Sequence, residues 1–155
     1  MAAVVTTLLL APGFPVSAQM KPSVPGTPGD PVWQRTLHLS DGRTFVTDGA
    51  LAMDGALAKP ASLPDSTLPA ASAARVESYL AAPLEDECAF ADLKANADGR
   101  TYTAPSGLRL NATYINFLKR TLSTRSLRFR MGKELQPMVI LFEGKRVGVL
   151  MAVRR

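Results

Sequence analysis

Cysteine and histidine are almost absent from this chain, which holds only Cys88 and His38 among its 155 residues. A single cysteine excludes an internal disulfide bond, and two isolated residues do not make the usual His/Cys ligand set of a metal site. Cys88 lies in the alternating apolar stretch ECAFADL, so we expect a small core residue. The sequence therefore predicts no metal and no other cofactor.

Patterns that carry catalysis are also missing. His38 has no identifiable Ser or Cys partner for a nucleophilic triad, and no glycine-rich phosphate loop of the P-loop or dinucleotide type occurs. The acidic run from Glu85 to Glu87 follows a predicted helix end, where a solvated loop is more common than an acid/base pair. We therefore expect a non-catalytic protein.

Acidic residues are scarce in the last third of the chain. Residues 100–155 hold 12 Lys/Arg against 2 Asp/Glu, a net charge of +10, whereas residues 1–99 hold 6 against 11, a net charge of −5. So basic a segment attracts polyanions, of which nucleic-acid phosphate backbones are the commonest. The alternative is a solvated basic surface that keeps the protein soluble.

The apolar run near the N-terminus, Ala2 to Ala11, is too short to span a bilayer, so we expect no membrane anchor. Residues 1–19 resemble a secretory signal in this run and in Val16-Ser17-Ala18, but no Lys or Arg precedes the run. Two interpretations stay open: a possible signal peptide, or a mis-called leader ahead of a true start at Met20.

Proline is concentrated in the first half of the chain. Residues 20–31 contain four Pro and two Gly, which predicts a flexible segment. A single domain is expected over residues 32–155. Its predicted fold class is α+β, with two helices packed on an antiparallel sheet.

Alternation and turn residues predict the elements of the first half. Trp33 to Leu39 and Thr44 to Thr47 are expected strands around the turn at Gly42, and Thr47-Asp48-Gly49 is a further turn that leads into residues 50–53. A proline-bearing loop over 59–69 then leads to a helix that ends before Pro83, with Thr67 as its expected cap. Its apolar stripe is Ala73, Val76 and Leu80.

The second half is predicted as short strands around one clear helix. Strands are expected over 87–93, 100–104 and 108–110, with a turn at 96–99. The helix begins at Asn111 or Thr113, and three strands follow over 127–131, 138–142 and 147–153. The apolar stripe of this helix is Tyr114, Ile115, Leu118 and Leu122.

The closing part of the chain resembles the final unit of the bacterial DNA polymerase beta sliding clamp, a processivity factor. The stretches that carry the resemblance are LRLNATYINFLKRTL, SLRFRM, QPMVILFEG and VGVLMAVRR. RTFVTDGALAMDG, followed by a proline-bearing loop and a helix, is similar to the clamp motif around Thr-Asp-Gly. The resemblance covers about residues 37–82 and 107–155. Departures are Ala152 in place of a proline, a terminal Arg155, Ala50-Leu51 in place of a polar pair, and one domain instead of three.

The resemblance implies a DNA clamp fold that serves DNA replication in the cytoplasm of a bacterium. A clamp binds duplex DNA without reading sequence and tethers DNA polymerase or other partners. Its helices face the DNA, and its sheets lie outside. By position, the implied DNA-binding residues are Arg75, Lys119, Arg120 and Arg125.

The resemblance also implies a groove that captures a short apolar peptide from partner proteins. The residues carried over to it are Thr47, Gly49, Val149, Met151, Val153 and Arg154. Because one domain cannot encircle DNA, a ring requires a homo-oligomer, and the C-terminal strand is the expected edge for pairing. The alternative function is an exported (secreted or periplasmic) small α+β binding protein of unknown ligand, which follows if residues 1–18 are a true signal peptide.

Overall fold

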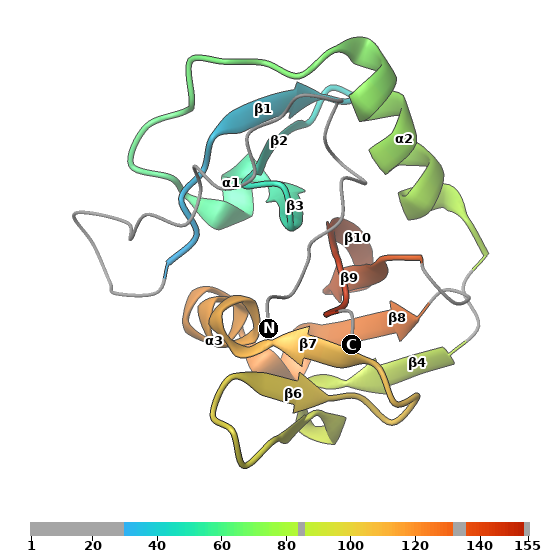
Figure 1. Cartoon of the computed structure of the whole chain (residues 1–155). Helices are drawn as coiled ribbons and strands as arrows, with labels where there is room; N and C mark the ends of the chain where they lie inside the picture. Colours follow the sequence, from blue (N-terminus) through green and yellow to red (C-terminus); the bar gives the residue numbers. More distant parts are fainter. Residues whose placement is uncertain (1–29, 84–85, 132–135, 154–155) are drawn as a thin grey trace.

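A computed structural model describes residues 30–83, 86–131 and 136–153 of the chain. These ranges contain a seven-stranded sheet, a three-stranded sheet and three α-helices (Figure 1). The predicted α+β class is therefore confirmed. The predicted leader at 1–19, most of the predicted flexible segment at 20–31, and Arg154 lie outside the described residues.

The large sheet is antiparallel at each of its strand pairs. Across the sheet the strands are β1 (Arg35–His38), β2 (Thr44–Thr47), β3 (Leu51–Asp54), β10 (Lys145–Leu150), β9 (Met138–Phe142), β8 (Leu127–Met131) and β4 (Asp86–Ala89). The predicted bounds of β2, β8 and β9 are confirmed. The last strand was predicted too far along the chain, because β10 begins at Lys145 and ends at Leu150.

The small sheet and the helices complete the fold. The small sheet consists of β5 (Lys94–Ala95), β6 (Thr101–Thr103) and β7 (Arg109–Asn111). The α-helices are α1 (Gly55–Ala58), α2 (Ala70–Ala81) and α3 (Ala112–Thr121), and the short 3-10 helices are η3 (Phe90–Asp92) and η4 (Thr124–Ser126). Helix α1 was not predicted, because four residues are too few to show helical periodicity.

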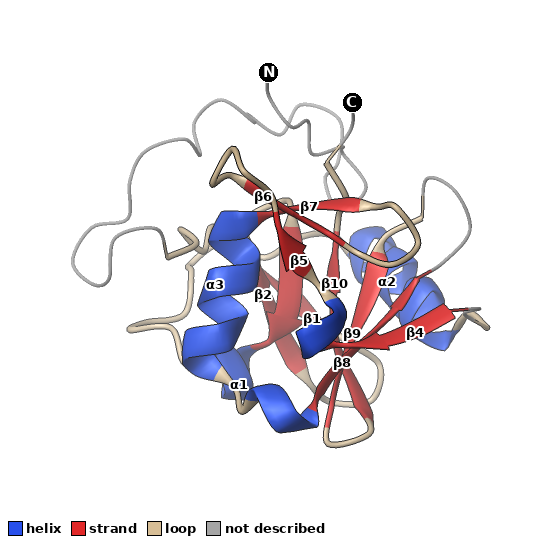
Figure 2. Ribbon diagram, turned by 90° about the horizontal axis from the view of Figure 1, so that it is seen from below, coloured by secondary structure: helices blue, strands red, loops and turns tan. Residues whose placement is uncertain are grey.

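The two longer helices cover opposite faces of the large sheet, because side chains alternate between the two faces of each strand. Leu37, Phe45 and Val149 pack with α2 on one face. Phe129 and Ile140 pack on the other face, in the cluster that includes α3 and the small sheet. Figure 2 shows α2 and α3 on either side of the strands.

Strand order corrects the expected role of the C-terminal strand. β10 lies between β3 and β9 in the middle of the sheet, so it is not an edge. The edges are β1 and β4, and β1 is covered, because Thr36 N donates to Ser66 O and Leu68 N donates to Thr36 O, both at 2.9 Å. Within the described ranges, β4 is therefore the one uncovered edge of the large sheet.

The start of α2 also differs from the prediction. Pro69 occupies the N-cap position and makes no side-chain hydrogen bond. Thr67 instead places its hydroxyl 2.8 Å from that of Thr36, where it helps to fasten the loop onto β1. The predicted apolar stripe of the helix is confirmed, since its three members are buried.

Candidate functional site

A hollow of about 360 Å³ opens beside α3 and is the candidate site. We call it the α3 hollow. It is lined by Gly99, Arg100, Asn111, Ala112, Thr113, Asn116 and Arg120. Two of these residues carry guanidinium groups and none carries a carboxylate, so the lining favours an anion.

Helix α3 presents one polar face to the hollow. Asn111 is its N-cap, and Asn111 Oδ1 accepts a hydrogen bond from Thr113 N at 2.8 Å, which confirms one of the two predicted caps. Thr113, Asn116 and Arg120 follow at spacings of three and four residues, so they share a face of the helix. The opposite face is held in the core by its buried apolar residues, such as Ile115.

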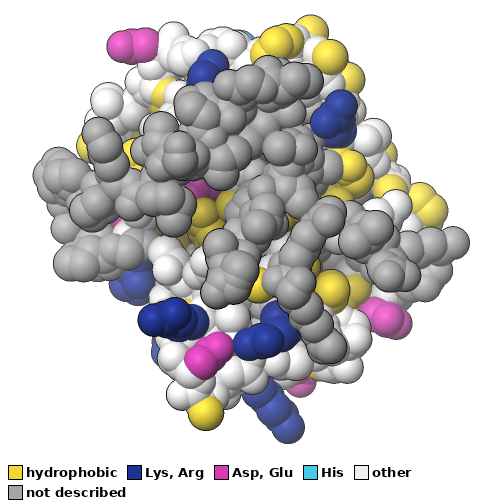
Figure 3. Space-filling view, viewed as in Figure 1, with side chains coloured by type: hydrophobic (Ala, Val, Ile, Leu, Met, Phe, Trp, Pro, Cys, Tyr) yellow, Lys and Arg dark blue, Asp and Glu magenta, His cyan; other side chains and the backbone are white. Residues whose placement is uncertain are grey.

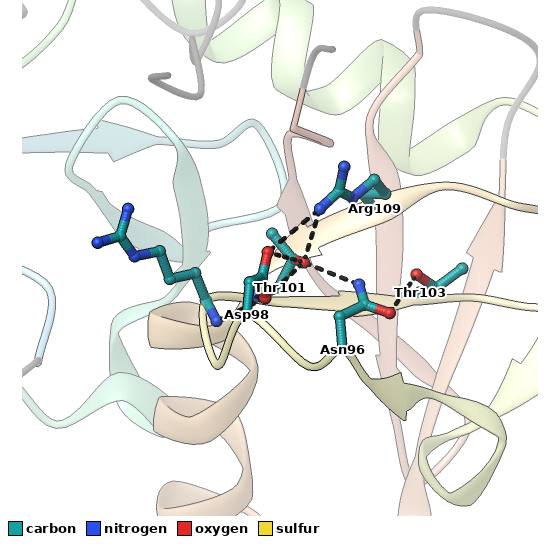
Figure 4. Close-up of polar contacts among 6 residues, drawn as sticks. Asn96, Asp98, Thr101, Thr103 and Arg109 are labelled. Atoms are coloured by element: carbon teal, nitrogen blue, oxygen red, sulfur yellow. Dashed lines mark hydrogen bonds and ion pairs between the residues drawn. The ribbon is translucent and has the colours of Figure 1, made fainter.

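The turn between β5 and β6 is braced by a polar network that Figure 4 shows in close-up. Asn96 Nδ2 donates to Thr101 Oγ1 at 2.8 Å, and Thr103 Oγ1 donates to Asn96 Oδ1 at 3.0 Å. An Arg109 guanidinium nitrogen lies 3.2 Å from Asp98 Oδ2. The network joins all three strands of the small sheet and fixes the backbone at the turn.

The Asp98 carboxylate fixes the backbone of Arg100, directly after the turn, by accepting hydrogen bonds from main-chain N–H groups. Its Oδ1 accepts from Arg100 N at 2.8 Å and from Thr101 N at 3.1 Å. The hydrogen bond from Arg100 N, followed by those from Thr101, holds the pKa of Asp98 below its usual value. The carboxylate is therefore charged near neutral pH, and the backbone at Arg100 is fixed by it.

Arg100 reaches α3 through the pairing of β6 with β7. Thr101 is the partner of Asn111 in this register, and Arg100 O accepts from Ala112 N at 2.8 Å. The side chain of Arg100 is exposed and makes no hydrogen bond or ion pair with any residue that the structure describes. Its guanidinium is therefore available to a ligand.

The structure gathers three of the four predicted DNA-binding residues and separates the fourth. Lys119 and Arg120 are exposed in the last turn of α3, and Arg125 is exposed in η4 directly after it. Arg75 is exposed on α2, on the far side of the large sheet. Figure 3 shows Lys and Arg side chains gathered over the region of β6 and β7, with an acidic group among them. The DNA-binding roles themselves stay predictions.

Part of the positive charge of the last third is engaged in ion pairs within the protein. Arg128 and Arg130 both pair with Glu87 on β4, and Arg109 pairs with Asp98. The acidic first part of the chain therefore neutralises some of the basic last part. The positive charge available to a binding partner is therefore smaller than the net charge of residues 100–155 and is confined to a part of the surface.

The sequence analysis did not assign a role to Arg100 or Asn116. The turn at 96–99 and the cap at Asn111 were both visible as local patterns. The register between β6 and β7 places Arg100 beside α3. A local sequence pattern does not specify the register between two strands of three residues each, so this position could not be predicted.

The described residues of the predicted peptide groove lie mostly in the core. Met151 N donates to Ala50 O at 2.9 Å, so the backbone directly after β10 lies against the residue that follows the Thr-Asp-Gly turn. Four of the groove residues, Thr47, Gly49, Val149 and Met151, are buried, while Val153 is partly exposed. Their part in peptide capture stays a prediction.

Asp48 and Tyr114 connect the two motifs that carry the resemblance. The Tyr114 hydroxyl donates to Asp48 Oδ2 at 2.7 Å, and Asp48 Oδ1 accepts from Ala50 N at 2.9 Å and from Leu51 N at 3.0 Å. Burial raises the pKa of Asp48. Burial, followed by the charge of Asp48, raises the pKa of Tyr114. The Thr-Asp-Gly turn and the start of α3 are therefore locked together.

A second hollow, of about 550 Å³, lies beside β4. Its lining includes the carboxylates of Asp86, Glu87 and Asp92 together with Cys88. Burial raises the pKa of Cys88 to about 11, so its thiol stays protonated near neutral pH and is a poor nucleophile. The described ranges contain no group of three His, Cys, Asp or Glu side chains that could hold a metal ion.

No helix within the described ranges combines the length and apolar character that a membrane-spanning segment requires. Comparison of the chain with protein-family models, with curated proteins and with solved structures gives no match. The resemblance to the sliding clamp therefore rests on the sequence stretches quoted above, and function has to be argued from the site.

Proposed function

We propose that this protein is a non-catalytic domain that binds duplex DNA without reading its sequence, through the surface of α3. The observation that carries the proposal is the α3 hollow, whose lining includes Arg100 and Arg120 and no carboxylate. Arginine suits this task because its planar guanidinium matches phosphate oxygens with two parallel hydrogen bonds.

Arg120 can exchange its present partner for a phosphate. Its guanidinium pairs with Asp30 at 2.5 Å, and the two side chains are 40% and 30% exposed. An ion pair this open to water contributes about 0–1 kcal/mol, so a phosphate can displace Asp30 with little loss. Lys119 and Arg125 lie on the same stretch of chain and would extend the contact along the backbone of the duplex.

The clamp-type part of the proposal adds sliding, oligomerisation and the tethering of DNA polymerase in the cytoplasm. Contacts to phosphates alone permit sliding, because they carry no sequence information. Since α2 and α3 lie on opposite faces, only α3 would face the duplex in such an assembly. A partner peptide would bind where Met151 meets the Thr-Asp-Gly turn.

The sheet edges limit how a ring could be built. A head-to-tail ring closed by strand pairing needs two free edges on every copy. Residues 66–68 cover β1, so β4 is the single candidate within the described part of the large sheet. A head-to-tail ring of this protein would therefore need an interface made by side chains instead of strand pairing between the large sheets.

Single substitutions at the hollow test the proposal. Arg100→Ala and Arg120→Ala are each expected to lower the slope of log K against log salt by about 0.9, the value of one phosphate contact. Fluorescence anisotropy with a labelled duplex, repeated over a salt series on the full chain, measures both slopes.

The matched control is Arg75→Ala, which removes the same charge from the opposite face of the sheet. We expect this variant to keep the wild-type slope. Equal effects of all three substitutions would contradict a local site and would indicate only a response to net charge.

A further inference from the structure

Asn116 occupies the middle of the α3 face that lines the hollow, one turn after Thr113 and one turn before Arg120. Its amide Oδ1 accepts a hydrogen bond from the Tyr102 hydroxyl at 2.9 Å. Tyr102 is held in turn, because it lies on β6 and packs against the core cluster that includes α3. The contact with Tyr102 therefore sets the orientation of the Asn116 amide.

Three oxygen atoms around the hollow already accept hydrogen bonds from the protein. Asn111 Oδ1 accepts from Thr113 N, and Arg100 O accepts from Ala112 N, both at 2.8 Å. With Asn116 Oδ1 bound to Tyr102, two side-chain donors at the hollow have no hydrogen-bond partner in the described part of the chain. They are Nδ2 of Asn116 and the guanidinium of Arg100, beside the Thr113 hydroxyl, which can also donate.

The hydrogen-bond donors that the hollow offers to a ligand are therefore side chains and not the first backbone N–H groups of α3. The first two N–H groups of α3, at Ala112 and Thr113, are both engaged inside the protein. The site that remains combines the charge of Arg100, the guanidinium of Arg120 with its exchangeable partner Asp30, and a neutral amide donor. A compact anion with several acceptor oxygens satisfies these donors together, whereas a cation satisfies none of them.

We infer that the α3 hollow seats a single phosphate group, and that Tyr102 positions Asn116 as a neutral donor to it. The identity of the phosphate as part of a DNA backbone rests on the function proposed above. A volume of about 360 Å³ is larger than a phosphate group and leaves room for the adjoining atoms of a nucleic-acid chain. Free inorganic phosphate has the same chemistry, so the test includes both.

Asn116→Asp tests the donor directly. The new carboxylate can still accept from the Tyr102 hydroxyl, so the fold is kept, but it replaces two donors with a negative charge in the hollow. We expect the variant to bind duplex DNA at least about tenfold more weakly than Ser123→Asp. Ser123 is exposed and follows α3 outside the lining, so Ser123→Asp adds the same charge without entering the site.

Tyr102→Phe tests the positioning role. It keeps the ring in the core and removes only the hydroxyl that orients the amide. Weaker duplex binding with an unchanged salt slope is expected, because no charge is lost. An effect on urea unfolding without any effect on binding would show that Tyr102 is merely structural.

A nuclear magnetic resonance titration separates this inference from the proposed function. The side-chain amide signal of Asn116 in the 15N-labelled full chain is followed as inorganic phosphate or the duplex is added, and both are expected to shift it. A shift with phosphate but no duplex binding would support the phosphate seat and contradict the DNA proposal. Duplex binding that leaves the Asn116 signal unmoved, or equal weakening by Asn116→Asp and Ser123→Asp, would overturn the inference.

Discussion

Replacing Phe129 with alanine is expected to lower the free energy of unfolding by about 3 to 5 kcal/mol. Phe129 lies on β8 with no exposed surface, between Cys88 on β4 and Ile140 on β9. Its ring centroid lies 6.3 Å from that of Phe90, in the cluster that also includes α3. The substitution removes most of a buried ring from close-packed surroundings, so it loses both apolar burial and dispersion contacts.

Urea unfolding followed by tryptophan fluorescence measures this effect. Trp33 is the single tryptophan, and its ring centroid lies 5.7 Å from that of Phe117 on α3, so its emission reports on this side of the core. Leu63→Ala is the control, because Leu63 is 56% exposed and a surface change is expected to stay within about 0.5 kcal/mol. Similar small effects of both substitutions would contradict the assigned core.

Removal of the Asp48 carboxylate is expected to be the second largest effect. Asp48→Ala leaves the Tyr114 hydroxyl and the N–H groups of Ala50 and Leu51 without their acceptor, so we expect a loss of about 2 to 4 kcal/mol. Asp48→Asn is the matched variant. Its amide oxygen can still accept from both N–H groups, and the Tyr114 hydroxyl can rotate to accept from the new NH₂, so a loss of about 1 kcal/mol or less is expected.

The pH dependence of the same contact gives a separate check. Burial, followed by the charge of Asp48, raises the pKa of Tyr114 in the folded protein, whereas tyrosine in an unfolded chain titrates near 10. Above about pH 10 the unfolded chain therefore binds fewer protons than the folded one, and stability falls as pH rises. Tyr114→Phe removes this term, so the stability advantage of the wild type should shrink by about 1.4 kcal/mol per pH unit there.

Unfolding curves of the wild type and Tyr114→Phe, collected in parallel from neutral pH to about pH 11, measure this difference. Subtracting the two series removes the titration of the other groups. A constant difference across this range would show that the Tyr114 hydroxyl does not stay protonated in the folded state.

The sequence patterns predicted the structural elements that are determined by residues close together in the sequence. Period-two alternation located β8 at Leu127–Met131, and side chains able to cap a helix limited the start of α3 to Asn111 or Thr113, of which Asn111 is the N-cap. Gly42, Gly99 and Gly144 all adopt positive φ angles, of 92°, 68° and 79°, at the predicted turns. These features depend on neighbours along the chain, so they could be predicted from the sequence.

Strand order and the assignment of helices to sheet faces depend on contacts between residues far apart in the sequence. Local sequence patterns could therefore not predict them. The strongly apolar end of β10 indicates burial but does not say which strands flank it, so its central place was missed. The apolar stripes of α2 and α3 are equally compatible with one shared face or with two opposite faces. For the same reason, the sequence did not show that Arg75 lies apart from Lys119 and Arg120.

In the candidate site, too, some residues could be predicted from the local sequence and others only from contacts between distant segments. Lys119 and Arg120 could be named from their place off the apolar stripe of α3. Arg100 became a candidate only once the pairing of β6 with β7 was known, and the role of Asn116 required the hydroxyl of Tyr102. The roles of Lys119 and Arg120 stay predictions, and Arg100 and Asn116 move the centre of the candidate site toward the start of α3.

The central claim is that the α3 surface binds the phosphate backbone of duplex DNA, and one measurement tests it most directly. The affinity of the full wild-type chain for two short duplexes of unrelated sequence is measured by fluorescence anisotropy across a salt series. We predict similar affinities for both duplexes and a linear fall of log K with log salt. Absence of binding at low salt, or a strong preference for one sequence that persists as salt rises, would contradict the claim.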